Sequence, residues 1–310
     1  MKKQQREIIR PLIGLLAIWG VLFLFAPTFR QWLAIKDVLE QSTVLLIMAT
    51  GTTVMLIAGG LDLSVSSILP LVSVVTGSLL SYTESPVWVA VLAGLGVGIL
   101  CGFVNGVIVV KTGIPTLIAT LGTQLVFRGI SNMLGAGKDM SRFPESFQQL
   151  GGGFWGPVII TALAFFVTWF ILSKTKLGFN AYAIGGNDEV ARLSGVSVGF
   201  NNIIYYSFSG LMAALASIVQ TSRLNFAHTN RGQGMELWVI AAAVIGGTSM
   251  FGGVGGVTQT VIGVLIIRAL QAGLIHLHVP SFWQQVAIGL VLILAVWLDF
   301  LQRRAREKAV

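Results

Sequence analysis

The chain has few charged residues. Asp, Glu, Lys and Arg make up 10% of its 310 residues, while 55% are hydrophobic and the mean hydropathy is +0.83. An average soluble domain has roughly 25% charged residues, which it needs to cover its surface. Five charge-free runs are each longer than the roughly 20 apolar residues that cross a bilayer: 85–110, 146–173, 193–222, 237–267 and 269–298. The sequence predicts an all-α, polytopic membrane protein.

Other absences narrow the class further. The single cysteine, Cys101, lies inside an apolar run and has no partner for an intrachain disulfide. The apolar segments do not alternate over about ten residues, which excludes an outer-membrane barrel. The net charge of +8 is spread between the spans and forms no patch, so nucleic acid is excluded as a partner. No loop is large enough for a soluble domain, and we expect one transmembrane domain over residues 1–310.

Windows of apolar residues predict about ten spans. The basic N-terminus leads into a first span that we expect to be retained, because no small-residue cleavage site follows it closely. The spans lie near 11–27, 41–60, 64–82, 87–110, 114–134, 155–173, 201–221, 237–250, 256–277 and 282–301.

Lys and Arg residues orient these spans. With the N-terminus inside, twelve fall on inner segments, namely Lys2, Lys3, Arg6, Arg10, Lys111, Lys174, Lys176, Arg192, Arg303, Arg304, Arg306 and Lys308. Six fall on outer segments, namely Arg30, Lys36, Lys138, Arg142, Arg223 and Arg231. The bias predicts that both termini are cytoplasmic.

Catalytic patterns are missing. None of His228, His276 and His278 has the spacing of a metal ligand, and no serine has an evident histidine partner, so we expect neither a catalytic site nor a metal site. The glycine-rich run 246–256, GGTSMFGGVGG, lacks the Gly-Lys-Ser/Thr ending of a phosphate-binding loop. It is predicted to end a helix and to turn the chain at the membrane edge.

Small residues recur at every fourth position of the fourth predicted span. Such a stripe lets two helix backbones approach closely in lipid. Tight internal packing is the favoured interpretation, and a sliding or subunit interface is the weaker one. The stripe consists of Ala90, Gly94, Gly98, Gly102 and Gly106.

A polar stripe marks the fifth predicted span. Thr116, Thr120, Gln124 and Arg128 follow one another at steps of four, so they share a helix face. Neutral hydroxyl and amide groups there suit a path for a polar, uncharged solute, and hydrogen bonding between helices explains them equally well. Two acids, Asp62 and Glu236, are expected at span edges, either as functional carboxylates or as interface residues and helix caps.

The longest inner loop contains a short helix signal at 187–195, NDEVARLSG. Asn187 is a good N-cap, Asp188 and Glu189 suit the first turn, and Gly195 suits a left-handed end. Such a helix either presses on a cytoplasmic partner or simply connects two spans.

Four ordered motifs then resemble a known family. Residues 59–65 read GGLDLSV, 114–122 read IPTLIATLG, 183–196 read AIGGNDEVARLSGV, and 246–253 read GGTSMFGG. Over roughly 10–302 the chain is similar to the permease subunits of bacterial ABC importers of the ribose/xylose/galactose type. Three positions depart from the family pattern: Ser66 and Gln259 replace glycine, and Trp238 replaces aspartate. These departures fit a different substrate or one member of a heterodimeric pair.

The resemblance implies a function and an assembly. The chain would be the permease subunit of an ATP-driven importer in the bacterial inner membrane, for a sugar or sugar-like solute. Its partners would be a P-loop ATPase, a periplasmic or lipid-anchored binding protein, and a second permease subunit, identical or different. It would bind no cofactor itself, since the ATPase uses the ATP. Autoinducer-2, a polyol or a nucleoside are alternative solutes, and an ion-coupled secondary transporter is a weaker alternative.

Two sets of residues are the candidate functional sites. The resemblance makes one set the loop that docks on the ATPase: Gly186, Asn187, Asp188, Glu189, Val190, Arg192, Leu193 and Gly195. The other set is the candidate solute path: Asp62, Ser64, Thr116, Thr120, Gln124, Arg128 and Glu236.

Overall fold

A computed structural model describes residues 2–138 and 140–307, without the side chains at 2–8, 10, 281, 288, 298 and 302–307. Much of the charge at the two ends of the chain, on which part of the orientation count depends, lies outside the described side chains: Lys2, Lys3, Arg6, Arg10, Arg303, Arg304, Arg306 and Lys308.

The described residues are helical throughout, joined by turns, and Ser141 and Phe226 form one isolated antiparallel bridge between two loops. The elements are α1 (Lys2–Phe25), the 3-10 helix η1 (Pro27–Arg30), α2 (Trp32–Ile57), α3 (Val65–Tyr82), α4 (Val87–Thr112), α5 (Thr116–Gly135), α6 (Glu145–Gly151), α7 (Trp155–Lys174), α8 (Lys176–Gly186), α9 (Asp188–Leu193), α10 (Val198–Leu224), α11 (Met235–Ile245), α12 (Val257–His276) and α13 (Ser281–Glu307).

The helical membrane class is confirmed. Within the described residues, 7 helices are long and apolar enough to cross a membrane, and they are α2, α3, α4, α7, α10, α12 and α13. The other three predicted spans fall on α1, α5 and α11, where helices are present. The number ten therefore stays a prediction, while each predicted span corresponds to one helix.

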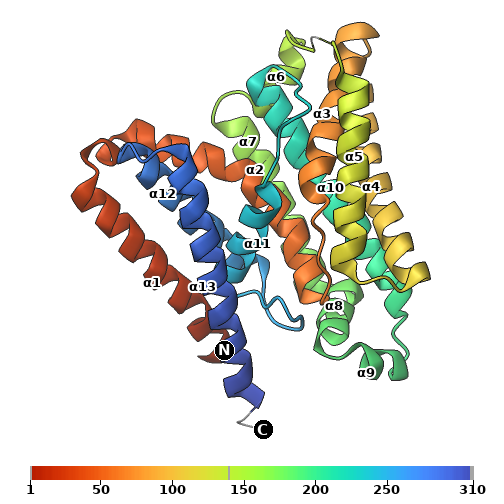
Figure 1. Cartoon of the computed structure of the whole chain (residues 1–310), viewed down its shortest axis with the longest axis vertical. Helices are drawn as coiled ribbons and strands as arrows, with labels where there is room; N and C mark the ends of the chain where they lie inside the picture. Colours follow the sequence, from red (N-terminus) through yellow and green to blue (C-terminus); the bar gives the residue numbers. More distant parts are fainter. Residues whose placement is uncertain (1, 139, 308–310) are drawn as a thin grey trace.

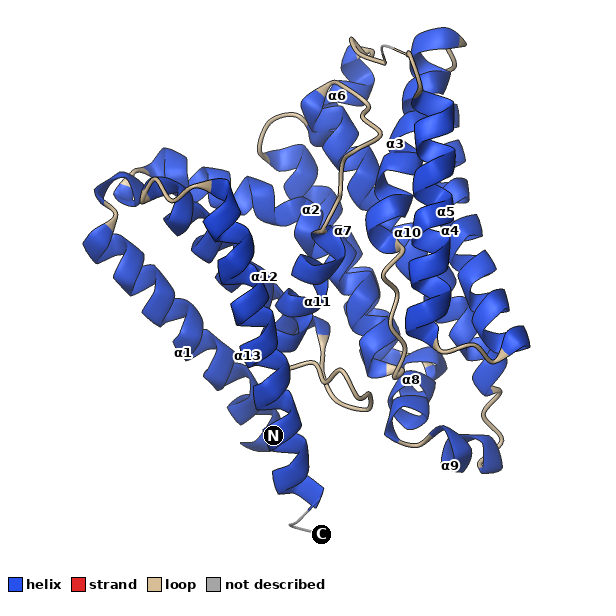
Figure 2. Ribbon diagram, viewed as in Figure 1, coloured by secondary structure: helices blue, strands red, loops and turns tan. Residues whose placement is uncertain are grey.

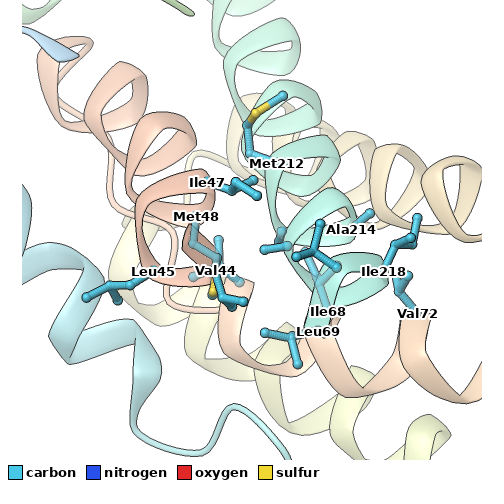
Figure 3. Packing of buried hydrophobic residues seen from close by; sticks show 14 of the residues in the cluster. Val44, Leu45, Ile47, Met48, Ile68, Leu69, Val72, Met212, Ala214 and Ile218 are labelled. Atoms are coloured by element: carbon cyan, nitrogen blue, oxygen red, sulfur yellow. The ribbon is translucent and has the colours of Figure 1, made fainter. Parts of the chain in front are cut away.

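Helices α2, α3 and α10 form the centre of the bundle. Leu45, Ile47 and Met48 of α2 meet Ile68 and Leu69 of α3 and residues of α10, all almost fully buried (Figure 3). From Ser42 to Ile57 helix α2 is buried on nearly every side and carries no charged residue, as expected of a helix surrounded by other helices. In lipid such helices are held together by close packing, because their surroundings are equally apolar.

The glycine stripe of α4 packs against α10, as the favoured interpretation predicted. A methyl group at Gly98 or Gly102 would collide with the α10 backbone, and at Gly106 it would lie 2.7 Å from the Cα of Ile203. The backbones of the two helices thus touch along about two turns. This contact holds α4 and α10 together as one closely packed pair.

The two ends of the bundle differ. Both chain termini and α9 lie toward one end, and α6 lies toward the other (Figure 1). Two loops run along the helices instead of over the ends: residues 58–64 lead from α2 into α3, and residues 225–234 lead from α10 into α11 (Figure 2). Helix α11 has 11 residues, about 16 Å, roughly half of a hydrocarbon core of ~30 Å. The loop before it supplies the rest of the crossing.

Candidate functional site

The polar stripe of α5 faces the starts of two other helices. Gln124 donates from Nε2 to the Ser66 hydroxyl (2.9 Å) and to Oε1 of Glu236 (3.0 Å). Arg128 donates from Nη2 to the Ser66 carbonyl at 3.4 Å. Ser66 is the second residue of α3, and Glu236 is the second residue of α11. The stripe therefore joins three helices through hydrogen bonds.

This junction lies near the midpoint of α5. Gln124 is the ninth of the 20 residues of α5, so its partners lie beside the midpoint of that helix. The sequence predicted Glu236 at the edge of a span. Glu236 lies in the first turn of α11, and that helix begins inside the bundle. The loop before α11 runs inward, and Gly232 (φ +79°) fits against the Ser66 carbonyl, where a Cβ would lie 2.6 Å away.

The junction has unused hydrogen-bonding capacity. Oε2 of Glu236 is buried and has no hydrogen-bond partner, although the residue as a whole is half-buried. Gln124 and Arg128 are also half-buried, so the group is accessible from one side. Two helix starts add the partial positive charge of their free N–H groups. A carboxylate, an amide, a guanidinium and a hydroxyl in this arrangement can donate to and accept from the hydroxyls of a polar solute.

Asp62 and Ser64 form a separate, deeper group. Oδ1 of Asp62 accepts from the Ser64 backbone N–H (3.0 Å) and hydroxyl (2.6 Å), and Oδ2 accepts from the Ser209 hydroxyl (3.0 Å). Asn105 of α4 donates to the Ser64 hydroxyl at 2.7 Å. All four side chains are almost completely buried. The group anchors the loop 58–64 to α4 and α10.

The two threonines of the stripe behave differently from Gln124. The Thr120 hydroxyl is fully buried and donates to the Thr116 carbonyl of its own helix at 2.8 Å. Thr116 itself is half-buried near the first turn of α5. Thr120 is thus satisfied within α5, which is the alternative that the sequence left open for threonines.

The sequence did not single out the partners of these groups. Asn105 and Ser209 are spaced far from Asp62 along the chain, and no local pattern marks them. Ser66 could have been noticed from the sequence, because it stands where the family that the chain resembles has glycine. Its hydroxyl is the group that accepts a hydrogen bond from Gln124. Trp238 is half-buried and packs against the main apolar cluster, so an apolar contact stands at that position.

The short helix α9 is formed as predicted. Oδ1 of Asn187 accepts from the Val190 N–H at 3.0 Å, and Gly195 adopts φ +85° after the helix. Val190 and Leu193 are 56% and 84% exposed, so apolar side chains face outward from this end of the bundle. A polar cleft of about 470 Å³ lies beside α9, between residues 184–189 and Ala58, Gly59, Val198, Asn202 and Phe251.

A metal site was not expected from the sequence. In the part of the chain that is described, no three His, Cys, Asp or Glu side chains gather as metal ligands would. The site offers hydrogen bonds and one uncompensated carboxylate oxygen, which suits binding.

Comparison with known proteins gives a consistent result. Residues 34–296 match the family described as "Branched-chain amino acid transport system / permease component". The ribose import permease protein of Escherichia coli K12 is 38% identical over 298 residues, which cover 94% of this chain and 92% of that protein. The L-arabinose transport system permease protein of the same strain is 36% identical, over 95% and 92% of the two chains. Its D-allose transport system permease protein is 37% identical, over 86% and 82%. No solved structure matches the chain.

Proposed function

This chain belongs to the family of permease components of branched-chain amino acid transport systems, and from that premise we propose that it forms the membrane path of an ABC importer for a monosaccharide. Three relatives, named as permeases for ribose, allose and arabinose, support the substrate class, and the similarity extends over at least 82% of each chain. The three sugars differ in size and stereochemistry, so the class is favoured over any one member.

The junction of Gln124, Ser66, Glu236 and Arg128 is the observation that carries this proposal. Sugars present many hydroxyls and no charge. A site that holds them needs both donors and acceptors, and it benefits little from a strong field of one sign. Helix starts that meet midway through the bundle are also typical of membrane sites where a solute is held during transport.

In this proposal, partner proteins supply the energy and deliver the solute. A P-loop ATPase supplies the energy and docks on α9 through the exposed Val190 and Leu193. A binding protein delivers the sugar at the opposite end, beside α6, and a second permease subunit completes the path in the bacterial inner membrane. The chain itself binds no cofactor, and it acts as a transport subunit.

Uptake in cells that lack the chain tests the proposal. The gene is deleted in its own host, and initial uptake of radiolabelled ribose, allose, arabinose and xylose is measured with and without a plasmid copy. We expect uptake of at least one sugar to fall on deletion and to return with the plasmid. Unchanged uptake of every sugar, together with loss of amino-acid uptake, would contradict the monosaccharide assignment.

A further inference from the structure

The glycine-rich turn 246–256 is attached to three other parts of the chain. Gly253 donates its N–H to the carbonyl of Ile57, the last residue of α2, at 2.8 Å. The Tyr182 hydroxyl of α8 donates to the Gly255 carbonyl at 2.9 Å. Oδ2 of Asp299, on α13, accepts from the Ser249 hydroxyl and from the Met250 N–H, each at 3.1 Å.

Backbone contacts make these attachments stiff. A Cβ on Gly252 (φ +89°) would lie 2.5 Å from the Gly185 carbonyl oxygen, and one on Gly253 (φ +72°) would lie 3.0 Å from the Cα of Gly186. A Cβ on Gly185 would collide with the Ile57 carbonyl. Three segments therefore meet without side chains between them. Atoms packed in this way pass a displacement on, because they have no free volume to absorb it.

The turn lies on a short route between α9 and the junction. Asn187 alone separates α8 from α9, so a displacement of α9 reaches Gly185 and Gly186 directly. From there it reaches the turn and the end of α2. The loop 58–64 follows, anchored by Asp62, and two residues further on Ser66 holds Gln124.

We infer that the turn 246–256 is the joint that transmits motion of α9 to the loop 58–64, and that Asp299 is a positioning residue that fixes this joint to α13. The inference depends on the proposed function, in which an ATPase moves α9. The carboxylate keeps one edge of the turn in place, so that a push from α8 displaces the end of α2 instead of only bending the turn. Without it, α9 still moves and the loop 58–64 follows less.

The test uses the complete importer, assembled from this chain, its ATPase and its binding protein, in lipid nanodiscs. Hydrogen–deuterium exchange of the amides of 58–64 is measured with and without ATP, and sugar uptake per ATP hydrolysed is measured in liposomes. We expect ATP to change exchange at 58–64 in the unaltered importer. Asp299→Ala is expected to abolish that change and to lower uptake per ATP about fivefold or more, the lower range of coupling between sites. Its ATPase should still co-purify.

Matched variants separate positioning from general damage. Asp299→Asn keeps a carbonyl oxygen that accepts both bonds, so it should restore coupling. Ser249→Ala removes one bond and should lower uptake per ATP less than Asp299→Ala, and it provides a second variant if the first fails to insert. Gln285→Ala, at an exposed position of α13, should match the unaltered importer.

Several results would overturn the inference. One such result is that Asp299→Ala and Ser249→Ala take up as much sugar per ATP as the unaltered importer. Another is that the ATPase no longer co-purifies with Asp299→Ala, which would assign the residue to docking. Absence of any ATP effect at 58–64 in the unaltered importer would also overturn it, and would leave sugar uptake, and with it the proposed function, standing.

Discussion

At the scale of single residues, the acids Asp62 and Glu236 have different surroundings. Asp62 is fully buried and accepts three short hydrogen bonds from Ser64 and Ser209. A typical hydrogen bond within a protein contributes about 0.5–1.5 kcal/mol, so these bonds stabilise the loop 58–64 against α10. Glu236 has one donor, Gln124, and one buried oxygen without a partner. Only Glu236 retains capacity for a solute.

Gln124 gives the sharpest test at this scale. Gln124→Leu removes the donor to Glu236 and Ser66 and leaves the carboxylate without its partner. An unmet buried group costs about 1–3 kcal/mol, so we expect initial sugar uptake to fall at least about fivefold. The measurement is uptake normalised to the amount of permease in the membrane.

Val126→Leu is the matched control for this change. Val126 is 56% exposed on the same helix and lies about 200° around it from Gln124. Uptake by this variant should equal that of the unaltered protein. Equal loss in both variants, or in neither, would show that the stripe serves packing alone.

At the scale of elements, the proposed mechanism depends on α9. Val190 and Leu193 face outward and have no described core to cover. Fully burying such a side chain contributes roughly 1.5–3 kcal/mol, so two acidic replacements should abolish docking of an ATPase. We predict that Val190→Asp with Leu193→Asp inserts normally, fails to co-purify with the ATPase, and takes up no sugar.

Binding on the opposite face separates this effect from misfolding. The double variant should still bind the binding protein, whose contacts lie at the α6 end. Normal co-purification of the ATPase with normal uptake would remove α9 from the coupling role.

The elements that the sequence predicted well are those decided by neighbours along the chain. Asn187 caps α9 because its side chain reaches an N–H three residues on, and the glycines of α4 share a face because they are four apart. The paired helix starts were not predictable in this way. Whether Glu236 lies at an edge or midway depends on how far the loop 225–234 runs inward, and that depends on contacts with α3, which no local pattern encodes.

The candidate site was predicted in part for the same reason. The stripe of α5 identified Gln124 and Arg128. The structure joins Gln124 to Glu236, and it joins both Gln124 and Arg128 to Ser66. It also places Asp62 and Ser64 in a different group, because Asn105 and Ser209 supply donors from helices distant in sequence. The sequence could not predict these donors, because they reach Asp62 and Ser64 only through the packing of α4 and α10.

At the scale of the whole molecule, the arrangement agrees with the predicted orientation. Both termini lie toward the end that carries α9 (Figure 1), which is required if α9 and the termini are all cytoplasmic. In a Cys101→Ser background, Glu189→Cys should react with a membrane-impermeant thiol reagent only from the cytoplasmic side, and Ser146→Cys, next to the start of α6, only from outside. Both positions are exposed. Labelling of both from one side would contradict the number of crossings.

The central claim is that this chain is a path without a motor, driven by a separate ATPase. The most direct measurement is sugar uptake by intact cells that are depleted of ATP while the proton gradient is maintained, compared with cells in which the gradient alone is collapsed. The account predicts that uptake through this chain stops when ATP is depleted and continues when only the gradient is lost. Uptake that persists without ATP and stops with the gradient would contradict it, and would identify an ion-coupled transporter instead.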